Sequence, residues 1–156
     1  QPPRDPREPI VDGKRWLLIG ALGVTIMAAT LGAFALALFE LGLGPAEAVT
    51  VAFVTLALAQ LWNVFNVRRA TQGVFINEIT RNPYVWGALG LCLFLIALAL
   101  WHPGLSAILG LPLPGADGLL LAGAMSLLPL AAGQAGLILS SVFSPETKEK
   151  PVHSVV

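Results

Sequence analysis

Four long runs of apolar residues without a charged side chain constrain the fold of this chain more than any other feature. The runs extend over residues 16–39, 49–67, 85–101 and 119–143. A helix needs about 20 mostly apolar residues to cross the hydrocarbon core of a bilayer. Backbone groups in lipid must be paired internally, so runs of this length form helices there. The sequence therefore predicts an all-α polytopic membrane protein with four transmembrane helices.

The composition supports this class and argues against nucleic acid as a partner. Of the 156 residues, 56% are hydrophobic and 12% are charged, whereas a typical soluble domain carries about 25% charged residues. Nine basic residues balance nine acidic ones, so no net positive charge favours nucleic-acid binding. The lipid bilayer is the partner that the composition predicts.

The positions of the basic residues give the four predicted helices a common orientation. Basic residues lie before the first run, between the second and third, and after the fourth: Arg4, Arg7, Lys14, Arg15, Arg68, Arg69, Arg81, Lys148 and Lys150. The other two connections contain Glu40, Glu47 and Asp117 instead. Because short cytoplasmic loops are enriched in Lys and Arg, both termini are predicted to be cytoplasmic. Residues 1–15 would then be a cytoplasmic linker, residues 16–143 the transmembrane domain and residues 144–156 a cytoplasmic tail.

Two other segments carry specific expectations. The beginning, "QPPRDPREPI", is charged and proline-rich and lacks the apolar core of a secretory signal, so we expect the chain to continue something longer. The segment "HPGLSAILGLPLPGADG" is expected to form a loop or a short interfacial helix. Pro129 should kink the fourth helix, because proline lacks an amide hydrogen and its ring crowds the preceding turn.

Three amides interrupt the second apolar run. Gln60, Asn63 and Asn66 are spaced i, i+3, i+6, and each step turns an α-helix by about 300°. The three side chains are therefore predicted to share one face. Asn66 lies near the predicted cytoplasmic end, where water or headgroups could satisfy it. Gln60 and Asn63 lie deeper and should face a partner helix or a cavity, because unpaired amides in hydrocarbon cost several kcal/mol.

Two interpretations of these amides compete. They could form hydrogen bonds between helices, or their oxygens could serve a cation site, since amide oxygens are hard neutral ligands suited to Ca²⁺. None of the four apolar runs contains Asp or Glu, so any such site must take its carboxylates from elsewhere. Gln60 and Asn63 are thus candidate metal ligands, or side chains that support such a site. The absence of Asp and Glu from the four runs also argues against an independent proton-coupled transporter.

The remaining polar side chains indicate no chemistry of their own. Gln134 is interpreted as a packing hydrogen bond, and His102 as an interfacial residue without other metal ligands at suitable spacing. The lone Cys92 is expected to behave as a small hydrophobic residue. No phosphate-binding glycine loop and no nucleophile–base pair is recognisable, so the sequence predicts no catalytic and no cofactor-binding residues.

The order of three motifs resembles a known family. "PPRDPREPI", then "TVAFVTLALAQLWNVFNVRR", then "GVFINEITRNPYVWGALG" together resemble the C-terminal membrane region of P-type cation-transporting ATPases, and most of all their calcium-pump-like branch. The resemblance covers about residues 2–143 and implies that the four helices are the seventh to tenth of such a pump. It also implies that Gln60 matches a Glu ligand of the animal reticulum calcium pumps, and Asn63 an Asp of the sodium,potassium pumps.

The resemblance implies a role for the chain within a larger machine. By itself the chain would not be an enzyme, because the phosphorylation-site motif and the nucleotide-binding domain lie outside it. ATP and Mg²⁺ would be cofactors of the complete pump, and the partners would be its other transmembrane helices, its cytoplasmic domains and the transported cation. Ca²⁺ is favoured, with Mg²⁺, Mn²⁺ and Na⁺ open, and the plasma membrane of a bacterium is the expected location.

Two other functions remain open on the sequence alone. The chain could be a stand-alone four-helix membrane scaffold or assembly partner. It could also be a small oligomeric transporter or channel that is built from several copies, although the absence of an acidic residue in the spans disfavours this alternative.

Overall fold

The structure is a computed structural model that describes residues 13–66 and 81–143. The helices in order are α1 (Gly13–Phe39), α2 (Pro45–Asn63), the 3₁₀ turn η1 (Val64–Asn66), α3 (Pro83–Trp101), α4 (Pro103–Leu109) and α5 (Gly115–Phe143). Four segments are long and apolar enough to cross a membrane: Trp16–Phe39, Pro45–Asn66, Pro83–Trp101 and Gly115–Gly136. The described residues contain no strand. The predicted all-α fold with four candidate membrane spans is therefore confirmed.

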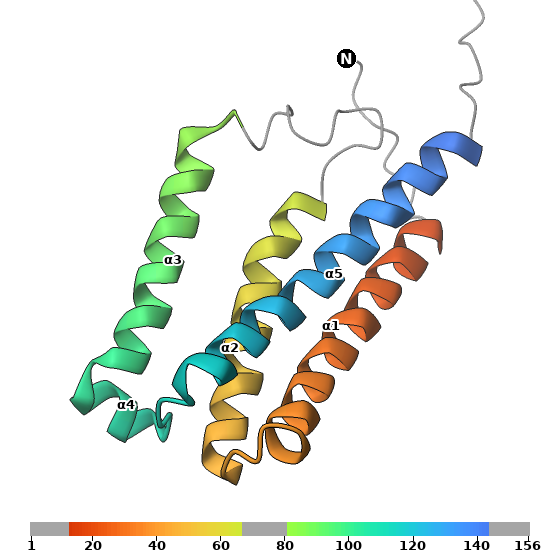
Figure 1. Ribbon diagram of the computed structural model, residues 1–156. Coiled ribbons are helices and arrows are strands. Elements are labelled where there is room, and N and C mark those ends of the chain that lie inside the picture. The colour runs from red at the N-terminus through yellow and green to blue at the C-terminus, as the bar shows by residue number, and fades with distance from the viewer. Residues whose placement is uncertain (1–12, 67–80, 144–156) are drawn as a thin grey trace, which may run out of the picture.

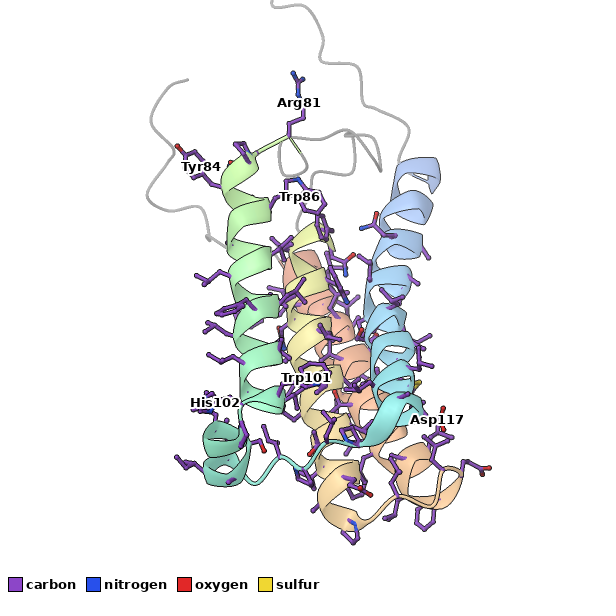
Figure 2. The ribbon with its side chains drawn as sticks, turned by 60° about the vertical axis from the view of Figure 1, so that its left-hand side comes forward. Arg81, Tyr84, Trp86, Trp101, His102 and Asp117 are labelled. Atoms are coloured by element: carbon purple, nitrogen blue, oxygen red, sulfur yellow. The ribbon has the colours of Figure 1, made fainter. Side chains whose placement is uncertain are left out.

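The four long helices run up and down, so that their ends gather at two opposite ends of the bundle (Figure 1). The beginning of α1 and the end of α5 lie at the same end. Figure 2 shows Arg81 at that end and Asp117 at the other, which is the charge separation that the basic segments predicted. That the end with Arg81 is cytoplasmic stays a prediction. The predicted linker and tail lie outside the described residues, apart from the first turn of α1.

Local sequence explains where α2 and α3 begin. Helix α2 starts at Pro45, which precedes the apolar run, and the carboxylate of Glu47 accepts a hydrogen bond from the backbone N–H of Gly44 at 3.0 Å. Helix α3 starts at Pro83, where the Asn82 side chain accepts a hydrogen bond from the N–H of Tyr84 at 3.0 Å. Proline in the first turn needs no hydrogen-bond acceptor. Both helices therefore start before the apolar residues that predicted them.

Small residues bring α1, α2 and α5 together. Helix α1 buries Ala29, Ala33 and Ala37, which lie four residues apart on one face. Helix α5 buries a similar row, namely Gly118, Ala122, Ser126, Pro129 and Gly133. Such rows let helix backbones approach closely in lipid, where dispersion rather than water exclusion drives association. Each of these three helices contacts the other two, and their contacts form the core of the molecule.

Helix α3 is attached differently. Among the described elements it packs on α2, η1 and α4, and only Leu89 and Leu100 are buried along its length. Near its beginning the ring of Trp86 lies against that of Phe65, with centroids 5.9 Å apart. Figure 1 shows α3 standing beside the cluster of α1, α2 and α5. The chain is thus a three-helix core with a fourth helix at its side.

Candidate functional site

One of the three amides in the second span, Asn66, faces α5 of the same chain and also bonds a second, Asn63. Asn66 is 5% exposed. Its Nδ2 atom donates hydrogen bonds to Asn63 Oδ1 at 3.1 Å and to the backbone oxygen of Pro129 at 3.2 Å. The expectation that water or headgroups satisfy Asn66 is therefore wrong, because α5 covers this side of η1. A buried amide in this position joins η1 to the middle of α5.

Gln134 completes this cluster from the opposite helix. Its Nε2 atom donates to the backbone oxygen of Phe65 and to Asn66 Oδ1, both at 3.0 Å. The interpretation of Gln134 as a packing hydrogen bond is confirmed. We call Asn63, Asn66 and Gln134 the amide cluster. Within the described residues no buried side-chain nitrogen or oxygen lacks a partner, and this includes the buried polar atoms of the cluster.

The 3₁₀ turn η1 explains why Asn66 and Asn63 meet. A 3₁₀ helix has three residues per turn, so side chains at i and i+3 eclipse one another. The change from α2 to η1 after Asn63 brings Asn66 closer in angle to Asn63 than continued α-helix would. A prediction from the α-helical period alone could not include this change.

Gly133 provides the space for Asn66. A Cβ atom at position 133 would collide with the Asn66 side-chain amide, and Gly133 is itself buried. Two turns earlier along α5, the Oγ atom of Ser126 accepts a hydrogen bond from Nε1 of Trp62 at 3.2 Å. The sequence analysis did not single out Gly133, Ser126 or Trp62. The buried row of small residues along α5 is the signal that could have found the first two.

Gln60 lies on a different face of α2. It is exposed, together with Val49, Phe53 and Leu56, and these four residues follow the spacing i, i+4, i+7, i+11 of one helix face. We call them the Gln60 face. The prediction that Gln60, Asn63 and Asn66 share one face is thus wrong, because α5 covers Asn66 while Gln60 is exposed.

Two apolar grooves meet at Gln60. The groove between α1 and α2 has a volume of about 380 Å³ and is lined by Gly23, Ile26, Met27, Thr30, Leu31, Leu56 and Gln60. The groove between α2 and α3 has a volume of about 250 Å³ and is lined by Gln60, Leu61, Val64, Val85, Ala88, Leu89 and Cys92. Gln60 is the residue common to both, and its amide is the most polar group in either lining. The grooves lie side by side along the Gln60 face.

The depth of Gln60 makes its exposure significant. It lies six residues before the end of η1, which corresponds to about 9 Å along a helix axis. The start of α2 at Pro45 is about 22 Å away in the other direction. With a hydrocarbon core of about 30 Å, this places the Gln60 amide inside the membrane rather than at its surface.

The acidic, His and Cys side chains of the described residues do not form a metal site by themselves. No group of three or more His, Cys, Asp or Glu side chains comes together within residues 13–66 and 81–143. Asn63 Oδ1 already accepts a hydrogen bond from Asn66. Of the two candidate cation ligands, Gln60 is the one whose side chain is exposed.

Comparison with known proteins agrees with these features. Residues 1–138 match the family described as "Cation transporting ATPase, C-terminus". The chain is 34% identical over 106 residues to a "Calcium-transporting ATPase" of Bacillus subtilis (strain 168). That alignment covers 68% of this chain and 12% of the relative, so the chain spans a small part of the relative's length. No solved structure matches. The chain therefore belongs to the family formed by the C-terminal membrane regions of P-type cation-transporting ATPases.

Proposed function

We propose that this chain is the membrane support domain of an ATP-driven calcium pump and that its Gln60 face packs against the transport helices of that pump. Family membership supports the cation-pump context, and the name of the Bacillus relative supports calcium. In this proposal ATP, Mg²⁺ and the phosphorylation chemistry belong to the catalytic part of the pump. The four spans provide a rigid packing surface, the wall, for the transport helices that bind the ion.

The observation that carries the proposal is the exposure of Gln60 within an otherwise apolar face. Val49, Phe53 and Leu56 could face lipid without penalty. An amide at the depth of Gln60 could not, because polar side chains in hydrocarbon cost free energy unless they find a partner. Two grooves beside Gln60 offer room for side chains of an added helix. A protein helix on this face would satisfy the amide and fill both grooves.

At such an interface Gln60 would bind the ion directly or form a hydrogen bond to a side chain that binds it. Its amide oxygen is a hard neutral ligand of the kind that Ca²⁺ accepts, and the transport helices would supply the carboxylates. Asn63 has a different role, since its oxygen already accepts a hydrogen bond from Asn66. We assign Asn63 to the support of this wall and Gln60 to the cation site.

The test is the substitution Gln60→Leu in the complete ATPase. It removes the amide and keeps a side chain of similar size, and the exposed position leaves the four-helix unit able to fold. We expect the Ca²⁺ concentration for half-maximal ATPase activity to rise about 10-fold or more, with normal expression. A tenfold change corresponds to about 1.4 kcal/mol. Unchanged calcium dependence would contradict the role of Gln60 at the ion site.

The matched control is Gln134→Leu, which removes an amide of the same kind from the amide cluster. Gln134 donates hydrogen bonds to Phe65 and Asn66 within this chain, so we expect a lower folding yield and an unchanged calcium dependence in the molecules that fold. Replacing Ca²⁺ by Mn²⁺ or Mg²⁺ in the same assay tests the choice of ion.

A further inference from the structure

An apolar surface lies at the end of the bundle opposite Arg81. Trp101 at the end of α3 is 59% exposed, Ile108 and Leu109 in α4 are 82% and 53% exposed, and Leu113 in the following segment is 45% exposed. We call these four residues the outer-end patch. Figure 2 shows α4 beside the lower end of α3, with His102 at their junction. In water all four side chains would expose apolar area at this end of the bundle.

This patch continues the apolar surface of α3. Leu91, Phe94 and Leu95 are exposed along that helix, and a membrane span presents such residues to lipid. From residue 82 to residue 116 the sequence contains no Lys, Arg, Asp or Glu. Between the span and the patch there is thus no charged side chain that would require water.

Helix α4 is held in a defined position. At its beginning Nδ1 of His102 accepts a hydrogen bond from the N–H of Leu105 at 3.3 Å. At its end Gly110 takes the left-handed conformation (φ 64°), and the N–H of Leu111 donates to the oxygen of Ser106 at 2.9 Å. Leu111 is buried in the core, at 6% exposure. The core therefore fixes one side of this segment, and Ile108 and Leu109 remain on its surface.

We propose that the outer-end patch inserts into the interfacial layer of the leaflet opposite the basic segments and that lipid, not protein, covers it. Trp at a span end and a short apolar helix beside it are the groups that lie at the boundary between headgroups and acyl chains. The patch fixes the depth of α3, which has few contacts with the other spans. Tyr84 and Trp86, both exposed near the other end of α3, hold that helix at the opposite interface.

A nitroxide probe at position 108 in the complete ATPase, reconstituted into liposomes, tests this proposal. The variant is Ile108→Cys with the other cysteines replaced, and the readout is the collision rate with oxygen, which enriches in lipid, and with a water-soluble nickel chelate. We expect oxygen collisions to dominate by several-fold and to place the probe about 5–10 Å below the headgroup boundary. The matched control is Glu40→Cys, in the exposed connection at the same end of the bundle, where nickel collisions should dominate.

Two results would overturn the proposal. Dominant nickel collisions at position 108 would mean that the patch lies in water. Low collision rates with both reagents would mean that another polypeptide covers it. Leu113→Cys lies outside α4 and is expected to give the same result as position 108, so the test does not depend on one substitution being tolerated.

Discussion

Asn66 and Pro129 lie 63 residues apart in the sequence, and the side-chain amide of Asn66 donates a hydrogen bond to the carbonyl oxygen of Pro129 at 3.2 Å. The contact joins the end of one predicted span to the middle of another. Asn66 also bonds Asn63, so two of the three amides of the second span take part in hydrogen bonds within the chain. Gln60 is left as the amide that faces outward, and the functional interpretation depends on this division.

The amide cluster predicts a measurable coupling between two helices. Asn66→Leu removes the donor to Pro129 and the partner of Gln134, so we expect the free energy of unfolding to fall by about 1–2 kcal/mol, the range of hydrogen bonds between membrane helices. Unfolding in mixed micelles of denaturing and mild detergent would measure it. The double variant with Gln134→Leu should lose less than the sum of the single losses, with a coupling energy of about 0.5–1 kcal/mol. Strictly additive losses would show that the two amides do not interact.

Gly133 is predicted to be intolerant of the smallest side chain. In a helix, alanine is favoured over glycine by about 1 kcal/mol, yet a Cβ at Gly133 would displace the Asn66 amide. We therefore expect Gly133→Ala to destabilise the chain by about 1–3 kcal/mol. Gly136→Ala is the matched control, because that glycine is exposed and a Cβ there meets no atom within 4 Å. Equal effects of the two substitutions in the same unfolding assay would be incompatible with the packing described here.

The groove between α1 and α2 gives a prediction about assembly rather than folding. Gly23 lines this groove and has no atom within 4 Å of a Cβ at its position, so Gly23→Leu should fit within the chain and fill the space meant for another helix. If a transport helix occupies this groove, the added side chain will displace it. We therefore expect normal insertion of the variant but at least a tenfold loss of calcium-dependent ATPase activity in the complete protein. Gly90→Leu, at an exposed glycine of α3 outside both grooves, should retain activity. A fully active Gly23→Leu enzyme would exclude close packing at this groove.

The four spans could be predicted from the sequence because run length, absence of charge and the positions of basic residues depend on the membrane rather than on tertiary detail. Charge placement also predicted that Arg81 and Asp117 lie at opposite ends. The position of α4 could be anticipated only as a loop or short helix. Its length depends on the His102 and Gly110 ends, which are local features that composition does not fix.

The amide site was predicted only in part. The spacing of Gln60, Asn63 and Asn66 correctly identified the second span as polar. The prediction of a shared face, however, required a continuous α-helix. It also could not say which neighbouring helix covers each side of α2. The 3₁₀ turn η1 moves Asn66 toward Asn63, and the row of small residues on α5 lets that helix come close enough to form hydrogen bonds with Asn66. Tertiary packing therefore buries Asn66 and leaves Gln60 exposed, although their spacing in the sequence predicted one common face.

Cross-linking from Leu56 shows whether other helices of the pump pack on the Gln60 face. A photoreactive amino acid at position 56 lies on this face and in the α1–α2 groove without altering Gln60. After irradiation of the complete ATPase in its membrane, mass spectrometry should find cross-links from position 56 to peptides outside residues 1–156. Cross-links to lipid alone would mean that the Gln60 face lies against the bilayer, and no helix of the pump would then pack on it.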